Sequence, residues 1–283
     1  MDYIADLVNN SVTLFIVNMA NEFLQMGFDL LTTFLLDFSD VNKYIKINSF
    51  LVYTQAIACA LLSVTVAWNA FKNQSGGAFK GGHSISILAM KIIFSGASIY
   101  FLPYLVMKIL IPINNFTIEL IKYIGKSYTI TPENMLESIK KIQGQGPAIA
   151  IGLLVLAIAL VILSIMSAVR YFDLIICIII SPFVALSIIN EGEGLSTWAR
   201  ETFAIVFTQS IHILMLQLFM KIIVETTGLT LIILALGNIV VMIKGANILK
   251  SYTHKTGVGG GVMALGSMAI MKSNMASMKS AVS

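Results

Sequence analysis

The sequence has few charged residues for its length. Of its 283 residues, 11% are Asp, Glu, Lys or Arg, whereas 57% are hydrophobic. So little charge cannot solvate the surface of a globular protein of this size, and so much apolar content is incompatible with an intrinsically disordered chain. The composition therefore predicts an integral membrane protein and argues against most classes of soluble enzyme.

Cysteine and histidine are scarce as well. Cys59 and Cys177 both lie in apolar runs, where a thiol behaves as a small hydrophobic group. The three histidines lie far apart, with no cysteine or carboxylate at the spacing of a metal site. No combination of nucleophile, histidine and acid stands out either. We therefore expect no metal, no cofactor and no enzymatic activity.

Long uncharged runs predict helices that cross a membrane. A bilayer core of about 30 Å needs about 20 apolar helical residues. The runs from Ser49 to Phe71, Pro147 to Val169 and Phe203 to Val224 meet this requirement. The run from Ile85 to Ile111 is also long enough, and Pro103 is expected to kink this helix or to end its straight part.

Two shorter runs leave the number of crossings open. Leu174 to Ile189 contains Pro182, and Leu229 to Ile248 contains Gly237, so each could be a short span or a re-entrant segment. The expected fold is an all-α, polytopic integral membrane protein. It has five or six transmembrane helices, preceded by an amphipathic N-terminal helix.

The amphipathic helix is predicted from polar residues that recur at steps of three or four. They alternate with apolar residues between Phe15 and Phe34, and they are Asn18, Glu22, Gln25, Asp29 and Thr33. We favour a helix that packs on the protein's own membrane domain. The alternative is a helix that lies on the membrane surface or lines the axis of an oligomer, although Lys and Arg typical of a lipid anchor are missing.

These patterns divide the chain into three parts. Residues 1–48 form the amphipathic N-terminal region, and residues 49–250 form a transmembrane domain that contains a polar loop at 112–147. Residues 251–283 form a tail rich in Gly, Ser, Met and Lys, which reads as flexible in composition.

Polar residues interrupt the run from Phe203 to Val224. They are Thr208, Gln209, His212, Gln217 and Lys221. This is too many polar groups for a helix that faces only lipid, so one side of it must meet protein or water. We favour hydrogen bonds between helices over the alternative, a water-filled path.

Two pairs of charged residues lie at the ends of apolar runs. Arg170 and Asp173 are three residues apart, so in a helix each charge could offset the desolvation of the other; we interpret them as the end of a helix hairpin. Glu191 and Glu193 lie in a glycine-containing turn. We favour a solvated loop there over a carboxylate pair that binds protons or cations.

The stretch from Arg170 to Gln217 resembles the most typical region of the TrbL family, the polytopic membrane subunit of conjugative, VirB-type type IV secretion systems. An Arg opens an apolar helix with a Pro inside it, a Gly/Glu turn follows, and then come Trp, Arg-Glu and Phe-Thr-Gln. In this sequence the pattern falls on Arg170, Pro182, Glu193, Trp198, Arg200, Glu201, Phe207, Thr208 and Gln209. Met90 to Gly125 and Thr256 to Gly261 are similar to further segments of the family.

This resemblance implies a non-enzymatic channel or scaffold subunit in the bacterial cytoplasmic membrane. Such a subunit assembles with an ATPase, a coupling protein and a bitopic scaffold subunit, and it passes DNA–protein or protein substrates that it contacts only transiently. Scattered basic residues give no support for a dedicated DNA-binding surface. The candidate residues for the substrate path or for assembly are Arg170, Asp173, Pro182, Glu193, Trp198, Arg200, Glu201, Gln209, His212, Gln217 and Lys221.

A homo-oligomer is also expected. The amphipathic N-terminal helix and the small-residue pairs Ala148/Gly152 and Ser164/Ala168 would allow close approach of helices. The alternative functions are a secondary transporter or other small-solute channel, with helices broken at Pro182 and Gly237, and a pore-forming lysis or toxin protein.

The orientation in the membrane follows from the distribution of charge. The first 42 residues hold six acidic residues and no Lys or Arg, whereas the rest of the chain carries all 18 basic residues against 8 acidic ones. Lys and Arg favour the cytoplasmic side. With six spans this rule would place both termini and the Lys-bearing loop inside. We favour five spans, with an external N-terminus and an internal tail, as the family resemblance implies.

A pair of engineered cysteines tests this orientation. In a variant without the two native cysteines, a cysteine at Ser11 should react with a membrane-impermeant thiol reagent added to intact cells, whereas one at Ser273 should not, because the acidic end lies outside and the basic end inside. Labelling at Ser273 alone would reverse the orientation.

Overall fold

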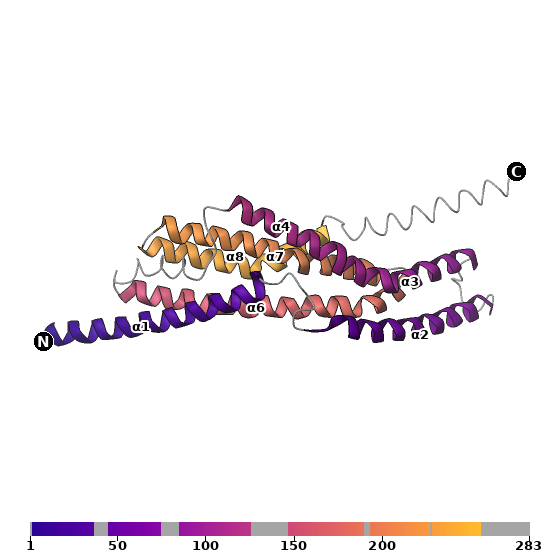
Figure 1. Ribbon diagram of the computed structural model, residues 1–283, viewed down its shortest axis with the longest axis horizontal. Helices are drawn as coiled ribbons and strands as arrows, with labels where there is room; N and C mark the ends of the chain where they lie inside the picture. Colours follow the sequence, from indigo (N-terminus) through magenta and orange to yellow (C-terminus); the bar gives the residue numbers. More distant parts are fainter. Residues whose placement is uncertain are drawn as a thin grey trace. The chain divides into compact units, whose positions relative to one another are not determined.

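The computed structural model describes residues 2–36, 45–74, 85–125, 147–189, 193–226 and 228–255. Regular structure in these ranges is helical throughout, which confirms the predicted all-α class (Figure 1). The helices are α1 (Asp2–Leu31), α2 (Ile47–Gln74), α3 (Ile85–Leu105), α4 (Ile111–Ile124), α6 (Pro147–Ala185), α7 (Glu193–Glu225) and α8 (Gly228–Lys255). Shorter turns follow α1, α3 and α6: two π-helical turns at Thr32–Leu36 and Val106–Leu110, and a 3-10 turn at Leu186–Ile188.

Five helical segments are long and apolar enough to cross a membrane. They are Ile47–Lys72, Leu88–Ile124, Ala148–Ile188, Glu193–Glu225 and Gly228–Gly245. Five is the lower of the two predicted numbers. Large apolar side chains are exposed along these helices, as expected of surfaces that face lipid. The chain is therefore a multi-pass membrane protein.

Helix α6 differs from the prediction of two separate apolar helices. It runs without interruption from Pro147 to Ala185, so Arg170 and Asp173 lie within one helix and the predicted hairpin end at these residues is wrong. The residues between the two charges are Tyr and Phe, which do not break a helix. Because the two apolar runs belong to one helix, only one crossing segment results.

The two helix breaks on which the alternative function of a transporter depends are absent from the described helices. Pro182 lies inside α6, and α8 continues past Gly237, so neither forms the broken helix of a transporter-like site. Pro103 lies inside α3, and a π-helical turn at Val106–Leu110 follows it. A proline cannot donate a backbone hydrogen bond, and local widening of the helix is one way to accommodate the loss.

Other boundaries differ from the predicted ones as well. Helix α7 begins at Glu193 instead of near Phe203, and α4 takes up residues 111–124 at the start of the predicted polar loop. Residues 126–146 of that loop, the residue Glu191 and the tail from residue 256 lie outside the described residues.

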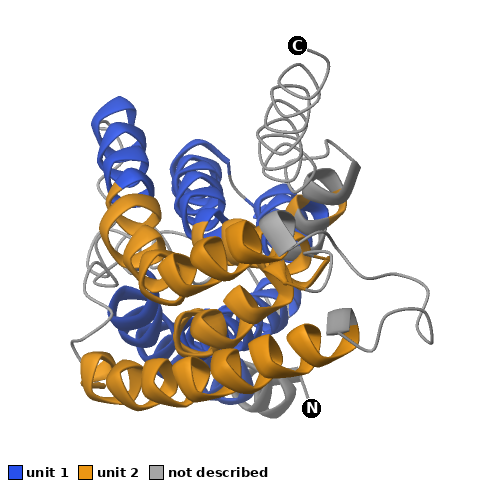
Figure 2. Ribbon diagram, turned by 90° about the vertical axis from the view of Figure 1, so that its right-hand side faces the viewer, with its two compact units in different colours: residues 1–40, 113–173, 207–248 blue, residues 41–112, 174–206, 249–283 orange. Residues whose placement is uncertain are grey.

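The chain forms two compact units that interleave in sequence (Figure 2). Unit 1 comprises residues 1–40, 113–173 and 207–248, and unit 2 comprises residues 41–112, 174–206 and 249–283. Each unit therefore draws on three separate stretches of the chain.

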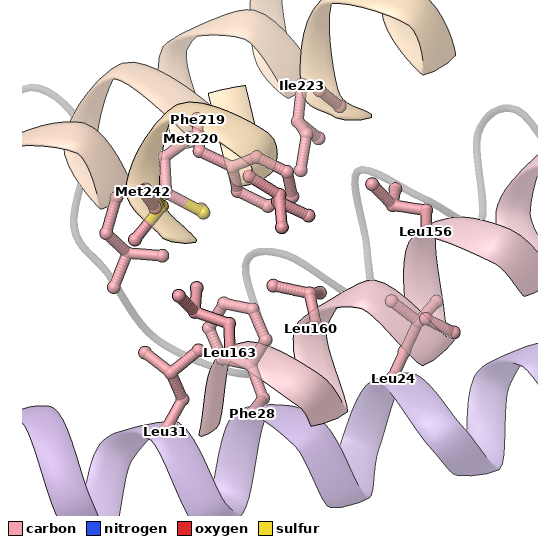
Figure 3. Packing of buried hydrophobic residues seen from close by; sticks show 14 of the residues in the cluster. Leu24, Phe28, Leu31, Leu156, Leu160, Leu163, Phe219, Met220, Ile223 and Met242 are labelled. Carbon is pink, nitrogen blue, oxygen red and sulfur yellow. The ribbon is translucent and has the colours of Figure 1, made fainter. Parts of the chain in front are cut away.

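Unit 1 is organised around an apolar core supplied by α1, α6, α7 and α8. Figure 3 shows side chains of these helices pointing toward one another. The helix α1 contributes one stripe to this core, namely Ala20, Leu24, Phe28, Leu31 and, in the π-helical turn, Leu35. The polar residues Glu22 and Asp29 of α1 are exposed. The favoured interpretation, a helix that packs on the protein's own membrane domain, is therefore confirmed for α1 from Ala20 onward.

Two glycines allow close approach of helices in unit 1. A Cβ atom on Gly27 of α1 would lie 3.2 Å from the backbone nitrogen of Val161 in α6, and one on Gly152 of α6 would overlap the side chain of Ile232 in α8. The Ser164 hydroxyl of α6 donates a hydrogen bond of 2.7 Å to the Gly27 carbonyl. Gly152 and Ser164, one member of each small-residue pair expected to support an oligomer, therefore contact other helices of the same chain.

Unit 2 contains α2 and α3 together with the end of α6 and the beginning of α7. Helix α2 exposes large apolar residues along its length. At its end, Trp68 stacks on Phe71 and Lys72 lies 5.5 Å from the Trp68 ring. Aromatic and basic side chains of this kind are common at the boundary of a membrane, so this end of α2 carries the residue types typical of such a boundary.

The two alanine substitutions Gly152→Ala and Gly237→Ala test the packing of unit 1. The first should lower the free energy of unfolding by about 1 to 3 kcal/mol, because the methyl group overpacks the contact with Ile232. A Cβ atom on Gly237 would meet nothing within 4 Å, so the second should be neutral or stabilise the helix by up to about 1 kcal/mol. Unfolding of the purified variants in detergent measures both, and equal effects would contradict this packing.

Candidate functional site

Helix α7 carries the polar residues predicted within its apolar run. Gln209 and His212 are buried, and Gln217 is half-buried. Lys221 is exposed, and its ammonium group lies 4.0 Å from the carboxylate of Glu225, one turn further along α7. Three of these side chains therefore point into protein, and only the last belongs to the surface.

Gln209 is the centre of a buried hydrogen-bond network in unit 1. Its amide nitrogen donates to the carbonyl oxygen of Leu35 at 2.8 Å, and its amide oxygen accepts from the side-chain nitrogen of Asn114 at 2.9 Å. The hydroxyl of Ser210 donates to the side-chain oxygen of Asn114 at 2.7 Å. These bonds join α7 to α4 and to the π-helical turn after α1. A buried network in which each amide has a partner fixes the arrangement of the helices that it connects.

His212 joins α7 to α8. Its ring nitrogen Nε2 lies 2.9 Å from the Met242 carbonyl oxygen. A carbonyl oxygen can only accept, so Nε2 carries the hydrogen in this contact. The residue is only 4% exposed, and Nδ1 is buried with no hydrogen-bond partner among the described residues. The geometry therefore fits a neutral imidazole that serves as a link between two helices.

Gln217 holds the end of α4. Its amide nitrogen donates to the Ile121 carbonyl oxygen at 3.0 Å. The backbone nitrogen of Gly125 donates to the same carbonyl at 3.0 Å, and a Cβ atom at Gly125 would overlap the Gln217 amide. A larger residue at position 125 would therefore displace the amide end of the Gln217 side chain from this contact. Together with Gln209 and His212, Gln217 supports the favoured interpretation of hydrogen bonds between helices.

Trp198 is buried in unit 2. It is 7% exposed, and its indole nitrogen donates to the Cys177 carbonyl oxygen of α6 at 2.9 Å. Nearby in α6, Pro182 cannot supply the backbone donor for the Ile178 carbonyl, and the Ser181 hydroxyl donates to it instead at 2.7 Å. The region around the proline in unit 2 is therefore held by side-chain donors.

The junction between α6 and α7 is held in the same way. From α3, the Ser95 hydroxyl donates to the Ala185 carbonyl at 2.9 Å, and the Lys91 ammonium donates to the Ile189 carbonyl at 3.4 Å. The backbone nitrogen of Leu195 donates to the Ser187 hydroxyl at 3.0 Å. Carbonyls at a helix end and amides at a helix start have no partner within their own helix, so these three side chains supply the missing ones.

The charged pair of α7 lies two turns inside the helix and not at its start. Arg200 is half-buried and donates to the Ser196 hydroxyl at 2.8 Å and to the Ser196 carbonyl at 3.2 Å. Glu201 is also half-buried, and Glu193 is exposed at the first position of α7. Arg200 and Glu201 can therefore be reached from outside the protein.

The other charged candidates lie on α6. Arg170 is buried, whereas Asp173, three residues further along the helix, is exposed. Among the residues that the structure describes, no group of three or more His, Cys, Asp or Glu side chains could hold a metal ion.

Several residues in these contacts were not predicted from the sequence. They are Asn114, Ser95, Lys91, Ser181, Ser187 and Ser196. An isolated polar residue in an apolar run was the only available signal. Such a residue indicates that a partner exists, because an unpaired polar group inside a membrane is costly, but it does not identify the partner.

Comparison with known proteins gives one family. No curated protein and no solved structure matches the chain. The family model for the conjugal transfer protein TrbL matches residues 1–282, which include both units and all the contacts described above. The chain therefore belongs to the TrbL family of conjugal transfer proteins.

Proposed function

We propose that this protein is a non-enzymatic scaffold of the transfer channel in the bacterial cytoplasmic membrane. Family membership supplies the process, conjugal transfer by a type IV secretion system. The proposal of a scaffold rests on the contacts of α7, because Gln209, His212 and Gln217 each form a hydrogen bond with a neighbouring helical segment of unit 1. These polar groups therefore stabilise the bundle and do not line a path within it.

The packed core of unit 1 supports a path formed by several subunits. Leu156, Leu160, Leu216 and Phe219 have no exposed surface, and protein interiors are packed as densely as organic crystals. A core of this kind has no room for a DNA–protein or protein substrate. We therefore place the path between copies of this chain in a homo-oligomer, or between this chain and other subunits.

The proposed partners are inferred from the exposed surface of the crossing helices and from membership of the TrbL family. Lipid covers the exposed apolar residues of the crossing helices. The ATPase, the coupling protein and the bitopic scaffold subunit of the secretion system assemble with the chain and provide the energy and the substrate. The substrate itself contacts the chain only transiently.

Alanine substitutions separate residues that stabilise the scaffold from residues that act in transfer. In a conjugating strain, Trp198→Ala and Gln209→Ala should lower membrane abundance and transfer frequency in proportion, because each removes a buried hydrogen bond and, for Trp198, about 3 to 5 kcal/mol of packing. Arg200→Ala and Glu201→Ala should keep abundance and lower transfer by about tenfold, as expected if these half-buried charges contribute about 1.4 kcal/mol to assembly.

Matched controls are available for both groups. Trp68→Ala removes an exposed tryptophan, and Glu225→Ala removes an exposed carboxylate whose ion pair with Lys221 is worth at most about 1 kcal/mol. Neither should change abundance strongly. A transfer-specific role of Arg200 and Glu201 is excluded if transfer merely follows abundance in their variants, and the scaffold role of Trp198 is excluded if its variant accumulates normally.

A further inference from the structure

The side chains of α1 that the structure describes, from Ser11 to Leu31, differ in their burial along the helix. The helix has 30 residues, which corresponds to a length of about 45 Å. The buried stripe begins at Ala20 and continues through Leu24 and Phe28. Of the side chains described from Ser11 to Met19, none is buried. The segment from Ser11 to Met19 therefore leaves large apolar side chains uncovered, which makes it a candidate for a contact with another molecule.

The exposed side of α1 combines apolar and acidic residues. Leu14 and Phe15 are each 66% exposed, and Met26 is 44% exposed. Steps of three and four residues place them on the same side of the helix as Asn18, Glu22 and Asp29, which are exposed as well. We call these six residues the outer face of α1. It lies opposite the stripe that begins at Ala20, so its apolar residues cannot reach the core of unit 1.

Charge decides which molecule can cover the outer face. Helix α1 is not among the segments long and apolar enough to cross a membrane, and no Lys or Arg occurs in the first 42 residues. A surface of anionic lipid would repel Glu22 and Asp29. The same face of a second copy would oppose like charges. A partner segment that carries Lys or Arg beside apolar residues complements both the acidic and the apolar side chains of the outer face.

We propose that the outer face of α1 docks a basic amphipathic helix from another subunit of the transfer system. The proposal rests on the proposed function, because it names a partner surface within that assembly. Leu14 and Phe15 would bury apolar surface against the partner helix, as in other helix-to-helix recognition. Glu22 and Asp29 would pair with its basic residues and set its register.

Photo-crosslinking in the complete transfer system tests this docking. Phe15 is replaced by p-benzoylphenylalanine in cells that express all subunits, and adducts are identified by mass spectrometry. The expected adduct joins one other subunit through a segment that carries Lys or Arg beside apolar residues. The matched control places the same amino acid at Val155, an exposed residue of α6, and should give no such adduct.

Charge variants provide the second part of the test. The double substitution Glu22→Lys and Asp29→Lys should lower the adduct yield by about tenfold, because like charges across an interface disfavour binding. Charge reversal of the basic residues in the crosslinked segment should restore the yield. The neutral double substitution Glu22→Gln with Asp29→Asn should give an adduct yield between that of the original protein and that of the reversed variant. Membrane abundance is measured for each variant, so that a loss of folding is not mistaken for a loss of docking.

Four results would overturn the docking proposal: no adduct at position 15, adducts to lipid only, adducts only to a second copy of this chain, or a yield that charge reversal leaves unchanged. Transfer frequency in a deletion strain separates this outcome from failure of the proposed function. If deletion of the chain leaves transfer intact, the proposed function fails. If deletion abolishes transfer but position 15 gives no adduct with another subunit, only the docking proposal fails.

Discussion

Amide and imidazole groups inside a membrane must find their hydrogen-bond partners within the protein, because lipid offers none. Helix α7 carries three such groups, at Gln209, His212 and Gln217. Their partners lie on α4, on α8 and in the turn that follows α1. The positions of these elements in unit 1 are therefore tied to one helix, and the apolar core forms around the same contacts.

Unit 2 follows the same constraint where the helix α6 departs from regular geometry. Pro182 removes one backbone donor, and the helix end leaves further carbonyls without partners. Ser181 and Ser95 each donate a hydroxyl hydrogen bond to one of these carbonyls. The glycine-containing turn that resembles the family pattern is thus flanked by bonded helix ends. In both units, the polar side chains of the crossing helices stabilise structure, which agrees with a scaffold.

The sequence was sufficient to predict the crossing helices that are apolar on all sides. The run from Ser49 to Phe71 corresponds closely to α2 (Ile47–Gln74), since length and composition alone define such a helix. Prediction was weaker for α6, because the charges at Arg170 and Asp173 suggested a boundary although no residue between them breaks a helix.

The sequence predicted which kind of interaction the polar residues of the candidate site make, but not which residues are their partners. Several polar residues in one apolar run indicate hydrogen bonds between helices, and the structure shows them. The partner of Trp198 is a backbone carbonyl at Cys177, and the partner of Gln209 includes Leu35, far back in the chain. Neither carbonyl has a signature in the sequence, because every residue carries one.

The claim that α7 stabilises the bundle and does not line a water-filled path can be tested by its access to water. Cysteines are introduced singly at Gln209, His212 and Lys221 in a variant without native cysteines, and labelling by a small water-soluble thiol reagent is measured in membranes that contain the assembled secretion system. Lys221 is exposed and should be labelled, whereas the buried positions 209 and 212 should remain unlabelled in variants that reach normal membrane abundance. Rapid labelling at both buried positions would show that water reaches this side of α7 and would contradict the account.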